Sequence, residues 1–77
     1  MYSTAWCGYC HRLKRLMQDA AIPFVVVDLE ADDDAAAFVM SRNDGDQTVP
    51  TLLFDDGSTL TNPSLREVQE KLAELAA

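Results

Sequence analysis

Basic residues, cysteines and long apolar runs are all scarce in this chain of 77 residues. Six Lys and Arg stand against 13 Asp and Glu, which gives a formal net charge of −7. That balance argues against nucleic acid or an anionic membrane surface as the main partner. No apolar run approaches the roughly 20 residues that cross a membrane. No signal peptide precedes the first cysteine, so we expect a reducing, cytoplasmic setting.

The chain holds only two cysteines, Cys7 and Cys10, and one histidine, His11. A zinc site needs about four ligands, so a site within one chain is disfavoured and we expect no metal. A structural disulfide across two intervening residues would close too short a loop to constrain much of the unfolded chain. A Cys-x-x-Cys pair that follows a short strand and opens a helix is typical of a redox dithiol.

The two sulfurs are predicted to play different parts. Residues Trp6 to Ala21 are predicted to form a turn and a helix, with Cys7 at the helix N-terminus. The first-turn amides of a helix lack intrahelical partners, and its dipole places partial positive charge there, so a thiolate is favoured at Cys7. Cys10 falls on the apolar stripe with Leu13 and Met17 and should face inward, still protonated. We therefore expect Cys7 to be the nucleophile and Cys10 the resolving thiol.

Charged side chains crowd the same predicted helix. Arg12, Lys14 and Arg15 are half of all the basic residues. They form either a solvated helix face or a positive zone that favours the thiolate and attracts an anionic or polar substrate. His11, four residues after Cys7, is either a solvent-facing residue or a local base.

The predicted elements follow the order β-α-β-α-β-β-α within one domain, 1–77. The strands are expected at 1–4, 24–29, 51–54 and 59–61. Two strands joined by a helix should be parallel with a right-handed crossover, and the last two should form an antiparallel hairpin through Asp55–Ser58. A four-stranded mixed sheet with helices on both faces is an α/β arrangement, the minimal thioredoxin fold, and we expect a monomer.

Strand and helix boundaries follow from local signals. The β-branched run Phe24–Leu29 predicts a strand buried on both faces. The acidic run Asp32–Asp34 is predicted to cap the second helix rather than to bind a metal. Asn43-Asp44-Gly45 is predicted to end that helix.

The start of the last helix is open between two registers. In one, Asn62 is the N-cap and Pro63 the first helical residue. In the other, Ser64 and Glu67 form a capping box. A pair between Glu67 and Lys71 is expected on the helix surface, and a buried seam is expected from four residues: Leu65, Val68, Leu72 and Leu75.

Several motifs together resemble one family. They are Trp6-Cys7-Gly8-Tyr9-Cys10, Thr48-Val49-Pro50, Asp56-Gly57-Ser58 and Thr61-Asn62-Pro63. The chain resembles the glutaredoxins, most closely the mycoredoxins, which are the mycothiol-dependent glutaredoxins of actinobacteria. The resemblance implies that Cys7 and Cys10 are catalytic. It also implies that Pro50 is a cis proline that faces the thiols, the alternative being a trans proline in an ordinary loop.

The resemblance further places Thr48, Val49 and Pro50 in the substrate site. A cis peptide there would leave the backbone of Val49 free to pair with an extended thiol substrate, as in strand-like recognition. Two aromatic residues, Trp6 and Tyr9, flank the thiols. They are either edge-of-core residues or the lining of the groove that holds the thiol.

One segment departs from the family pattern. Glutathione-using members usually carry Gly-Gly-x-Asp before the last helix, and this chain has Thr61-Asn62-Pro63-Ser64. We therefore expect glutathione to bind poorly. Mycothiol, in which a cysteine is linked to a sugar–inositol, is the expected co-substrate, and no tightly bound cofactor is expected. Thr61 and Asn62 are expected to contact it, with an N-cap role for Asn62 equally open.

The function implied by the resemblance is a thiol–disulfide oxidoreductase. It would reduce mixed disulfides between mycothiol and client proteins by a monothiol mechanism, with Cys7 as nucleophile. One alternative is a dithiol electron donor of the NrdH-redoxin kind, reduced by thioredoxin reductase. Another is an iron–sulfur cluster carrier that acts as a thiol-bridged dimer.

Overall fold

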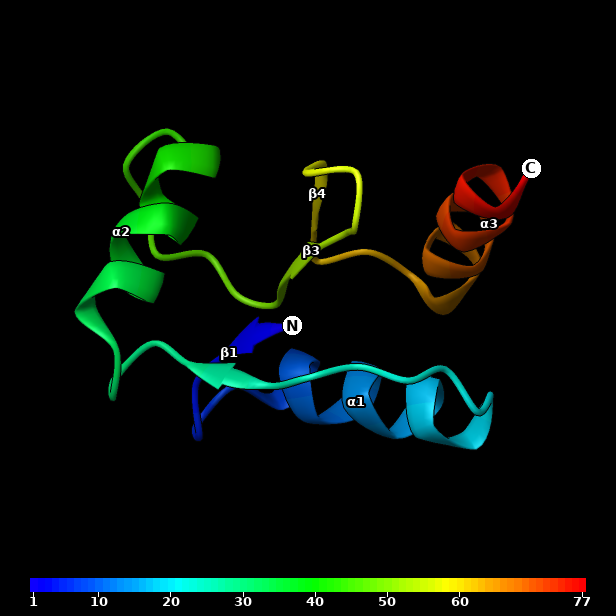
Figure 1. The fold of residues 1–77 in the computed structure, drawn as a ribbon. Coiled ribbons are helices and arrows are strands. Elements are labelled where there is room, and N and C mark those ends of the chain that lie inside the picture. The colour runs from blue at the N-terminus through cyan, green and yellow to red at the C-terminus, as the bar shows by residue number, and fades with distance from the viewer.

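The computed structural model describes all residues 1–77 and places the strands in one mixed sheet (Figure 1). The elements are β1 (Tyr2–Ser3), α1 (Gly8–Asp19), β2 (Val27–Asp28), α2 (Asp33–Arg42), β3 (Thr51–Leu53), β4 (Thr59–Thr61) and α3 (Leu65–Ala76). The strand order is β2-β1-β3-β4, with β1 and β2 parallel and the other two pairs antiparallel. The expected order β-α-β-α-β-β-α and the mixed sheet are confirmed.

The sheet separates two apolar clusters. On one side, Cys10 and Leu13 of α1 and Val68 of α3 pack with Leu52 of β3. On the other side, the buried face of α2, including Val39, packs with residues of β1 and β2. Figure 1 shows α2 on one side of the strands and α3 on the other. Helices therefore cover both faces, and α1 begins at the edge where β1 ends.

The prediction for the second strand was wrong in extent and burial. Only Val27 and Asp28 of the run pair as a strand, and Val25 is 77% exposed. The reason is the place of β2 at the edge of the sheet. An edge strand has a neighbour on one side only, and this neighbour, β1, is two residues long. A β-branched run shows strand propensity but not whether the strand lies at the centre of the sheet.

The ends of α2 follow the local signals. Asp32 caps the helix, because its Oδ1 accepts a hydrogen bond from the Ala35 amide at 3.1 Å. The helix ends at Asn43, and the chain then reverses through Asp44 and Gly45, both of which have positive φ. Both predictions for this helix are confirmed.

The second of the two registers for α3 is the correct one. Ser64 is the N-cap, and Ser64 and Glu67 form a complete capping box. Asn62 lies two residues earlier, with φ of 48°, and is not the cap. Glu67 does not pair with Lys71, because its carboxylate accepts the Ser64 amide at 3.0 Å. Lys71 instead pairs with Asp56 at 3.2 Å.

The predicted seam of α3 is only partly buried. Val68 is fully buried, Leu65 is half-buried, and Leu72 and Leu75 are exposed. Because β3 and β4 are three residues long, the sheet does not extend far enough to cover the C-terminal half of the helix.

We predict that Asp56 makes the fold acid-sensitive. The Ser58 hydroxyl and amide both donate to its carboxylate, and Lys71 lies beside it. These contacts lower the pKa of Asp56 from 3.8 to about 2. Because the folded pKa is depressed, the stabilisation is fully present above pH 3.8 and is lost as the pH falls through 2.

Urea unfolding of wild type and Asp56→Asn across this range checks the prediction. The variant should be the less stable protein at pH 6, and the two midpoints should converge near pH 2. A difference that does not change with pH would contradict it.

Candidate active site

The N-terminus of α1 holds the sulfur of Cys7 in the position of a helix cap. Cys7 is the N-cap residue with extended backbone, and its Sγ accepts a hydrogen bond from the Cys10 amide at 3.1 Å. An acceptor in this place satisfies one of the amides that a helix leaves unpaired. Gly8 begins the helix, so the turn after β1 delivers the sulfur directly to the helix start.

Cys10 lies one turn deeper and is 1% exposed. Burial, followed by its contact with Cys7, raises the pKa of Cys10 to about 12. Its thiol is therefore protonated at neutral pH, as expected from the sequence. Both cysteines are free. The two cysteines thus differ in their surroundings: the Cys7 sulfur receives an amide hydrogen bond, and burial keeps the proton on Cys10.

The loop before β3 faces this helix start. The Val49–Pro50 peptide is cis, so the expectation of a cis proline is confirmed. The Val49 carbonyl lies 3.9 Å from the Cys7 sulfur. The Val49 amide donates to no group of the protein. A free backbone donor beside the sulfur is the arrangement that an extended thiol substrate can pair with.

A polar network holds this loop, and its centre is a residue that sequence reasoning missed. Asn43, at the end of α2, donates through Nδ2 to the Val39 carbonyl at 2.8 Å and to Thr51 Oγ1 at 3.2 Å. Thr61 Oγ1 donates to Asn43 Oδ1 at 2.6 Å. Thr51 Oγ1 in turn donates to the Thr48 carbonyl at 2.8 Å.

Two of the predicted substrate residues, Thr48 and Thr61, therefore belong to the support of the loop. The sequence marked Asn43 only as a helix stop. Its link to Thr61, 18 residues away, has no local signal, because it depends on how α2 packs against β3 and β4.

His11, on α1, contacts the turn that precedes Cys7. Its Nε2 lies 2.7 Å from the Ala5 carbonyl, so a proton on Nε2 fastens α1 to the turn before Cys7. The ring stays exposed. The solvent-facing interpretation is therefore confirmed, and the contact with Ala5 adds a positioning role that neither interpretation included.

Trp6 and Tyr9 are 73% and 68% exposed, so the edge-of-core interpretation was wrong for both. Cys7 itself is only 5% exposed. The two large aromatic side chains that flank Cys7 in the sequence are therefore exposed to solvent, whereas Cys7 itself is nearly covered. A substrate that reaches the sulfur has aromatic surface available to contact.

A groove of about 550 Å³ lies between α1 and the start of α3. Tyr9 and Arg12 line it from α1, and Asn62 lines it from the segment after β4. The Asn62 amide donates to the Pro50 carbonyl at 2.7 Å, so this wall is joined to the cis-proline loop. The structure thus places Tyr9 and Asn62, two of the predicted substrate residues, on the lining of one groove.

A second cavity, of about 630 Å³, is lined mainly by hydrophobic residues and by neither cysteine. Neither cysteine lines the smaller groove either, but we associate that groove with the site because it contains polar side chains and because Asn62, which lines it, donates to the Pro50 carbonyl. No group of His, Cys, Asp and Glu is placed to hold a metal ion. None of the helices has the length and apolar character needed to cross a bilayer.

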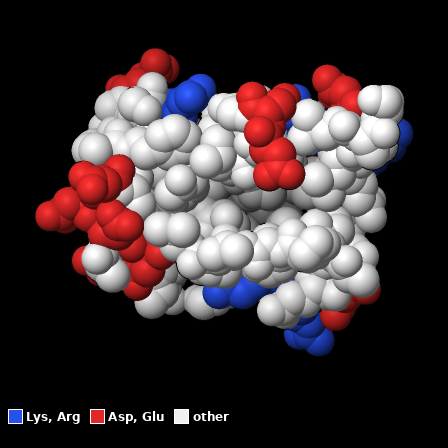
Figure 2. Space-filling view, in the orientation of Figure 1, with Lys and Arg blue, Asp and Glu red and all other residues white.

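Charge is distributed unevenly around the site. Figure 2 shows acidic side chains gathered at the end of the molecule that carries α2, and basic side chains along the edge where α1 lies. The sequence places Arg12, Lys14 and Arg15 on α1 and Asp32–Asp34 at the start of α2. The cysteine helix is therefore the basic part of an acidic protein.

A thioredoxin-like fold with a capped thiol and a cis proline opposite it defines a class of thiol–disulfide exchange proteins. The glutaredoxin family model matches residues 1–58. The chain is 53% identical to a Mycobacterium tuberculosis protein that carries a glutaredoxin name, over 99% of this chain and 90% of that protein. It is 37% identical to mycoredoxin 1 of Corynebacterium glutamicum, over 99% of this chain and 94% of that protein.

The chain belongs to the glutaredoxin family, and it is a thiol–disulfide oxidoreductase. The expectation from the sequence is confirmed at this level. The family match stops before β4, so the segment that departs from the family pattern lies beyond it.

We predict that removing the Asn43 side chain loosens the cis-proline loop. Asn43→Ala deletes the hydrogen bonds to Val39, Thr51 and Thr61, and the free energy of unfolding should fall by about 1–3 kcal/mol. Urea unfolding measures it. Ser41→Ala is the matched control, because it removes one exposed, local hydrogen bond at the same helix end. Equal effects of the two changes would contradict the role of Asn43.

We also predict that the two thiols differ in reactivity. Iodoacetamide at pH 7 should label Cys7 while Cys10 stays unlabelled in the folded protein, because its thiol is buried and protonated. Peptide mass spectrometry after a short reaction reads the two sites separately, and labelling in urea provides the control. Equal labelling of both sites in the native protein would overturn the assignment of roles.

Proposed function

We propose that the protein reduces mixed disulfides between mycothiol and client proteins, with Cys7 as the only essential thiol. The observation that carries the proposal is the difference between the two sulfurs. Cys7 accepts the Cys10 amide at the start of a helix, whereas Cys10 is buried and its pKa is raised to about 12. This difference supports Cys7 as the thiol that attacks an external disulfide.

The reaction needs two exchanges. The Cys7 thiolate attacks the mycothiol sulfur of the mixed disulfide, the client–mycothiol S–S bond breaks, and the client leaves as a thiolate that takes a proton from water. Cys7 then carries mycothiol. A second mycothiol thiolate attacks that sulfur and releases mycothiol disulfide together with the Cys7 thiolate. In the net reaction one free mycothiol and the mixed disulfide become the client thiol and mycothiol disulfide, so one disulfide replaces another and no further reductant enters.

The backbone at the cis proline supports binding of the mixed disulfide. The free Val49 amide, with its carbonyl 3.9 Å from the Cys7 sulfur, offers a donor and an acceptor to the cysteine portion of the substrate. Hydrogen bonds to backbone groups recognise any client with this cysteine linkage. They therefore provide binding without a requirement for one client sequence.

The choice of mycothiol rests on the segment before α3. Thr61-Asn62-Pro63-Ser64 stands where glutathione-using members usually carry Gly-Gly-x-Asp. The similarity to a protein named mycoredoxin 1 extends through this segment, since it covers 99% of the chain. We propose that the enzyme works as a monomer in the cytoplasm, where an NADPH-dependent reductase would regenerate mycothiol.

The test is reduction of a mycothiolated client protein by wild type and by two single variants. Cys7→Ser should abolish turnover. Cys10→Ser should turn over as fast as wild type or faster, because it removes diversion of the intermediate into a Cys7–Cys10 disulfide. Loss of all activity in Cys10→Ser would reject the monothiol mechanism.

The same assay separates the other candidates. Equal turnover with glutathione would reject the choice of mycothiol. Direct reduction of the oxidised protein by thioredoxin reductase and NADPH would indicate the dithiol electron donor. Visible absorbance after anaerobic purification would indicate the cluster carrier.

A further inference from the structure

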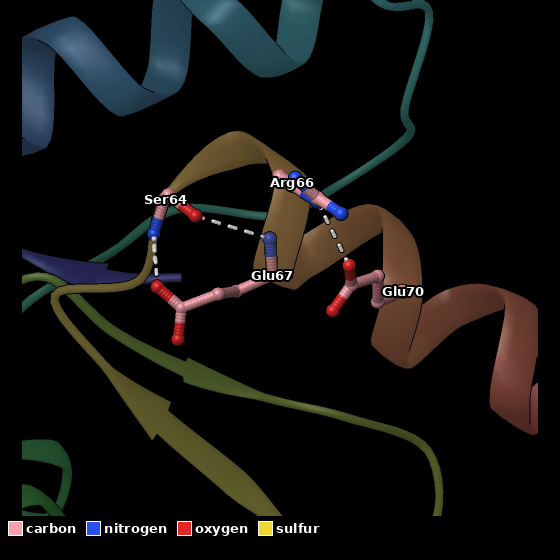
Figure 3. A network of polar contacts seen from close by, with 4 residues as sticks. All are labelled: Ser64, Arg66, Glu67 and Glu70. Atoms are coloured by element: carbon pink, nitrogen blue, oxygen red, sulfur yellow. Dashed lines mark hydrogen bonds and ion pairs between the residues drawn. The ribbon is translucent and has the colours of Figure 1, made fainter.

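Three cations on α1 have no ionic partner within the protein. Arg12 and Arg15 are exposed and Lys14 is half-buried, whereas every ion pair in the structure involves a cation of α3. Figure 3 shows one of those pairs, between Arg66 and Glu70. The chain has 13 acidic residues and six basic ones. Half of its cations therefore stay unpaired on a single helix, the one that Cys7 caps.

The stability of α1 does not account for these cations. A cation stabilises a helix when it lies in the last turn, where the dipole is negative, and the last turn of α1 contains no basic residue. Asp19 is the only acidic residue of the helix, and it pairs with none of the three. Arg12 and Arg15 are three residues apart on the same helix face, where like charges repel. The positive zone is therefore a better interpretation than a simple solvated face.

The positive charge lies close to the Cys7 sulfur. Arg12 and Arg15 follow Cys7 by about 7.5 and 12 Å along the helix, which is comparable with the screening length of about 8 Å in physiological salt. The field of the helix cations reaches the cysteine pair, since burial raises the pKa of Cys10 to about 12 and the charge of Lys14 opposes that rise. A negatively charged group bound by the two arginines would therefore lie within about one to two helical turns of the sulfur.

Two exposed aromatic side chains extend this surface to the start of the helix. Trp6 and Tyr9 are 73% and 68% exposed, and they lie on either side of Cys7 in the sequence. Tryptophan, tyrosine and arginine are the residue types that contribute most often to the energy of protein–protein binding. We call Trp6, Tyr9, Arg12 and Arg15 the α1 surface. Its composition is that of a protein-docking site.

The charge of the rest of the molecule defines the partner. α1 carries three cations and one acid, so of the net charge of −7 the other residues carry −9. Figure 2 shows acidic side chains gathered at the end that carries α2, and basic ones along the edge of α1. An extended polyanion such as nucleic acid would meet those acids as well. A short acidic segment of a protein fits along α1 alone, which is about 18 Å long.

We propose that the α1 surface docks client proteins through acidic residues that flank the oxidised cysteine of the client. Arg12 and Arg15 attract the acidic segment and increase its rate of encounter with Cys7, and the two aromatic rings contact the client chain. The acids outside α1 repel the same segment, so it approaches along this helix. The proposal concerns the client and not the low-molecular-weight thiol, and it does not depend on the choice of mycothiol.

The experiment measures exchange with two peptides that differ only in the charge of the residues around one cysteine. Each peptide carries its cysteine as a mixed disulfide with 2-mercaptopyridine, flanked on both sides by Glu in one peptide and by Lys in the other. The Cys7 thiolate attacks the peptide sulfur, the S–S bond to the pyridine breaks, and the leaving group takes a proton and is read by its absorbance as thiopyridone. The charge ratio is the second-order rate constant with the Glu peptide divided by that with the Lys peptide.

Wild type should give a charge ratio above one at low salt, although its net charge of −7 would by itself favour the Lys peptide. The ratio should fall as salt screens the interaction. Arg12→Gln and Arg15→Gln should each lower the ratio about 1.5- to fivefold, the size of one exposed ion pair.

Arg42→Gln is the matched control. It removes the same charge from an exposed arginine on α2 that also lacks an ion pair, so the charge ratio should stay close to the wild-type value. An effect of any substitution on the Cys7 thiolate itself cancels from the ratio, because both peptides are measured on each protein.

Three results would overturn the proposal. In the first, the wild-type ratio is one or lower at low salt. In the second, Arg42→Gln lowers the ratio as much as Arg12→Gln and Arg15→Gln do, or none of them lowers it. In the third, a DNA oligonucleotide inhibits exchange with the Glu peptide more strongly than a cysteine-free copy of that peptide does, which would indicate a nucleic-acid surface. No exchange with either peptide would reject Cys7 as the attacking thiol and the docking surface with it.

Discussion

The hydrogen bond from the Cys10 amide to the Cys7 sulfur is the contact on which the site depends. It makes the Cys7 sulfur part of the helix start, so the sulfur cannot be placed correctly unless α1 begins at Gly8. The same bond joins the two cysteines with opposite consequences. The amide of Cys10 supports the Cys7 sulfur, while the thiol of Cys10 is buried beneath it and keeps its proton. One turn of helix therefore separates a sulfur that accepts a helix amide from a buried, protonated thiol.

A second set of contacts places the cis-proline loop against that helix start. The carbonyl of Val49, the residue before the cis peptide bond, lies 3.9 Å from the Cys7 sulfur. Asn43 fixes its position by joining the end of α2 to Thr51 and Thr61. α2 thus contributes to the site without contributing a residue that touches the sulfur. α2 therefore supports the site although it lies on the opposite face of the sheet from α1.

Local chemistry in the sequence was sufficient for the features that are formed by neighbouring residues. The Cys7–Cys10 pair, the Asp32 cap and the reversal at Asp44-Gly45 all act within one turn of chain, and all were predicted. The run Phe24–Leu29 was misjudged because burial depends on strand order, which a single strand does not encode.

Contacts between residues on distant elements of the chain also could not be predicted from the sequence. Asn43 was identified only as a helix stop, and His11 only by its spacing from Cys7. Their partners in the structure, Thr61 for Asn43 and Ala5 for His11, are set by how α2 and α1 pack. Neither contact leaves a pattern in the residue types alone.

The start of α3 shows how a small difference in register bears on function. If Asn62 capped the helix, its side chain would accept helix amides and would not be available to a ligand. Ser64 performs that task instead, which leaves Asn62 outside the helix with a positive φ and a free side chain. Pro63, which lies between them, the capping box and the Asn62 bond to Pro50 together set the wall of the groove. The position of a helix cap therefore decides which polar groups line the groove.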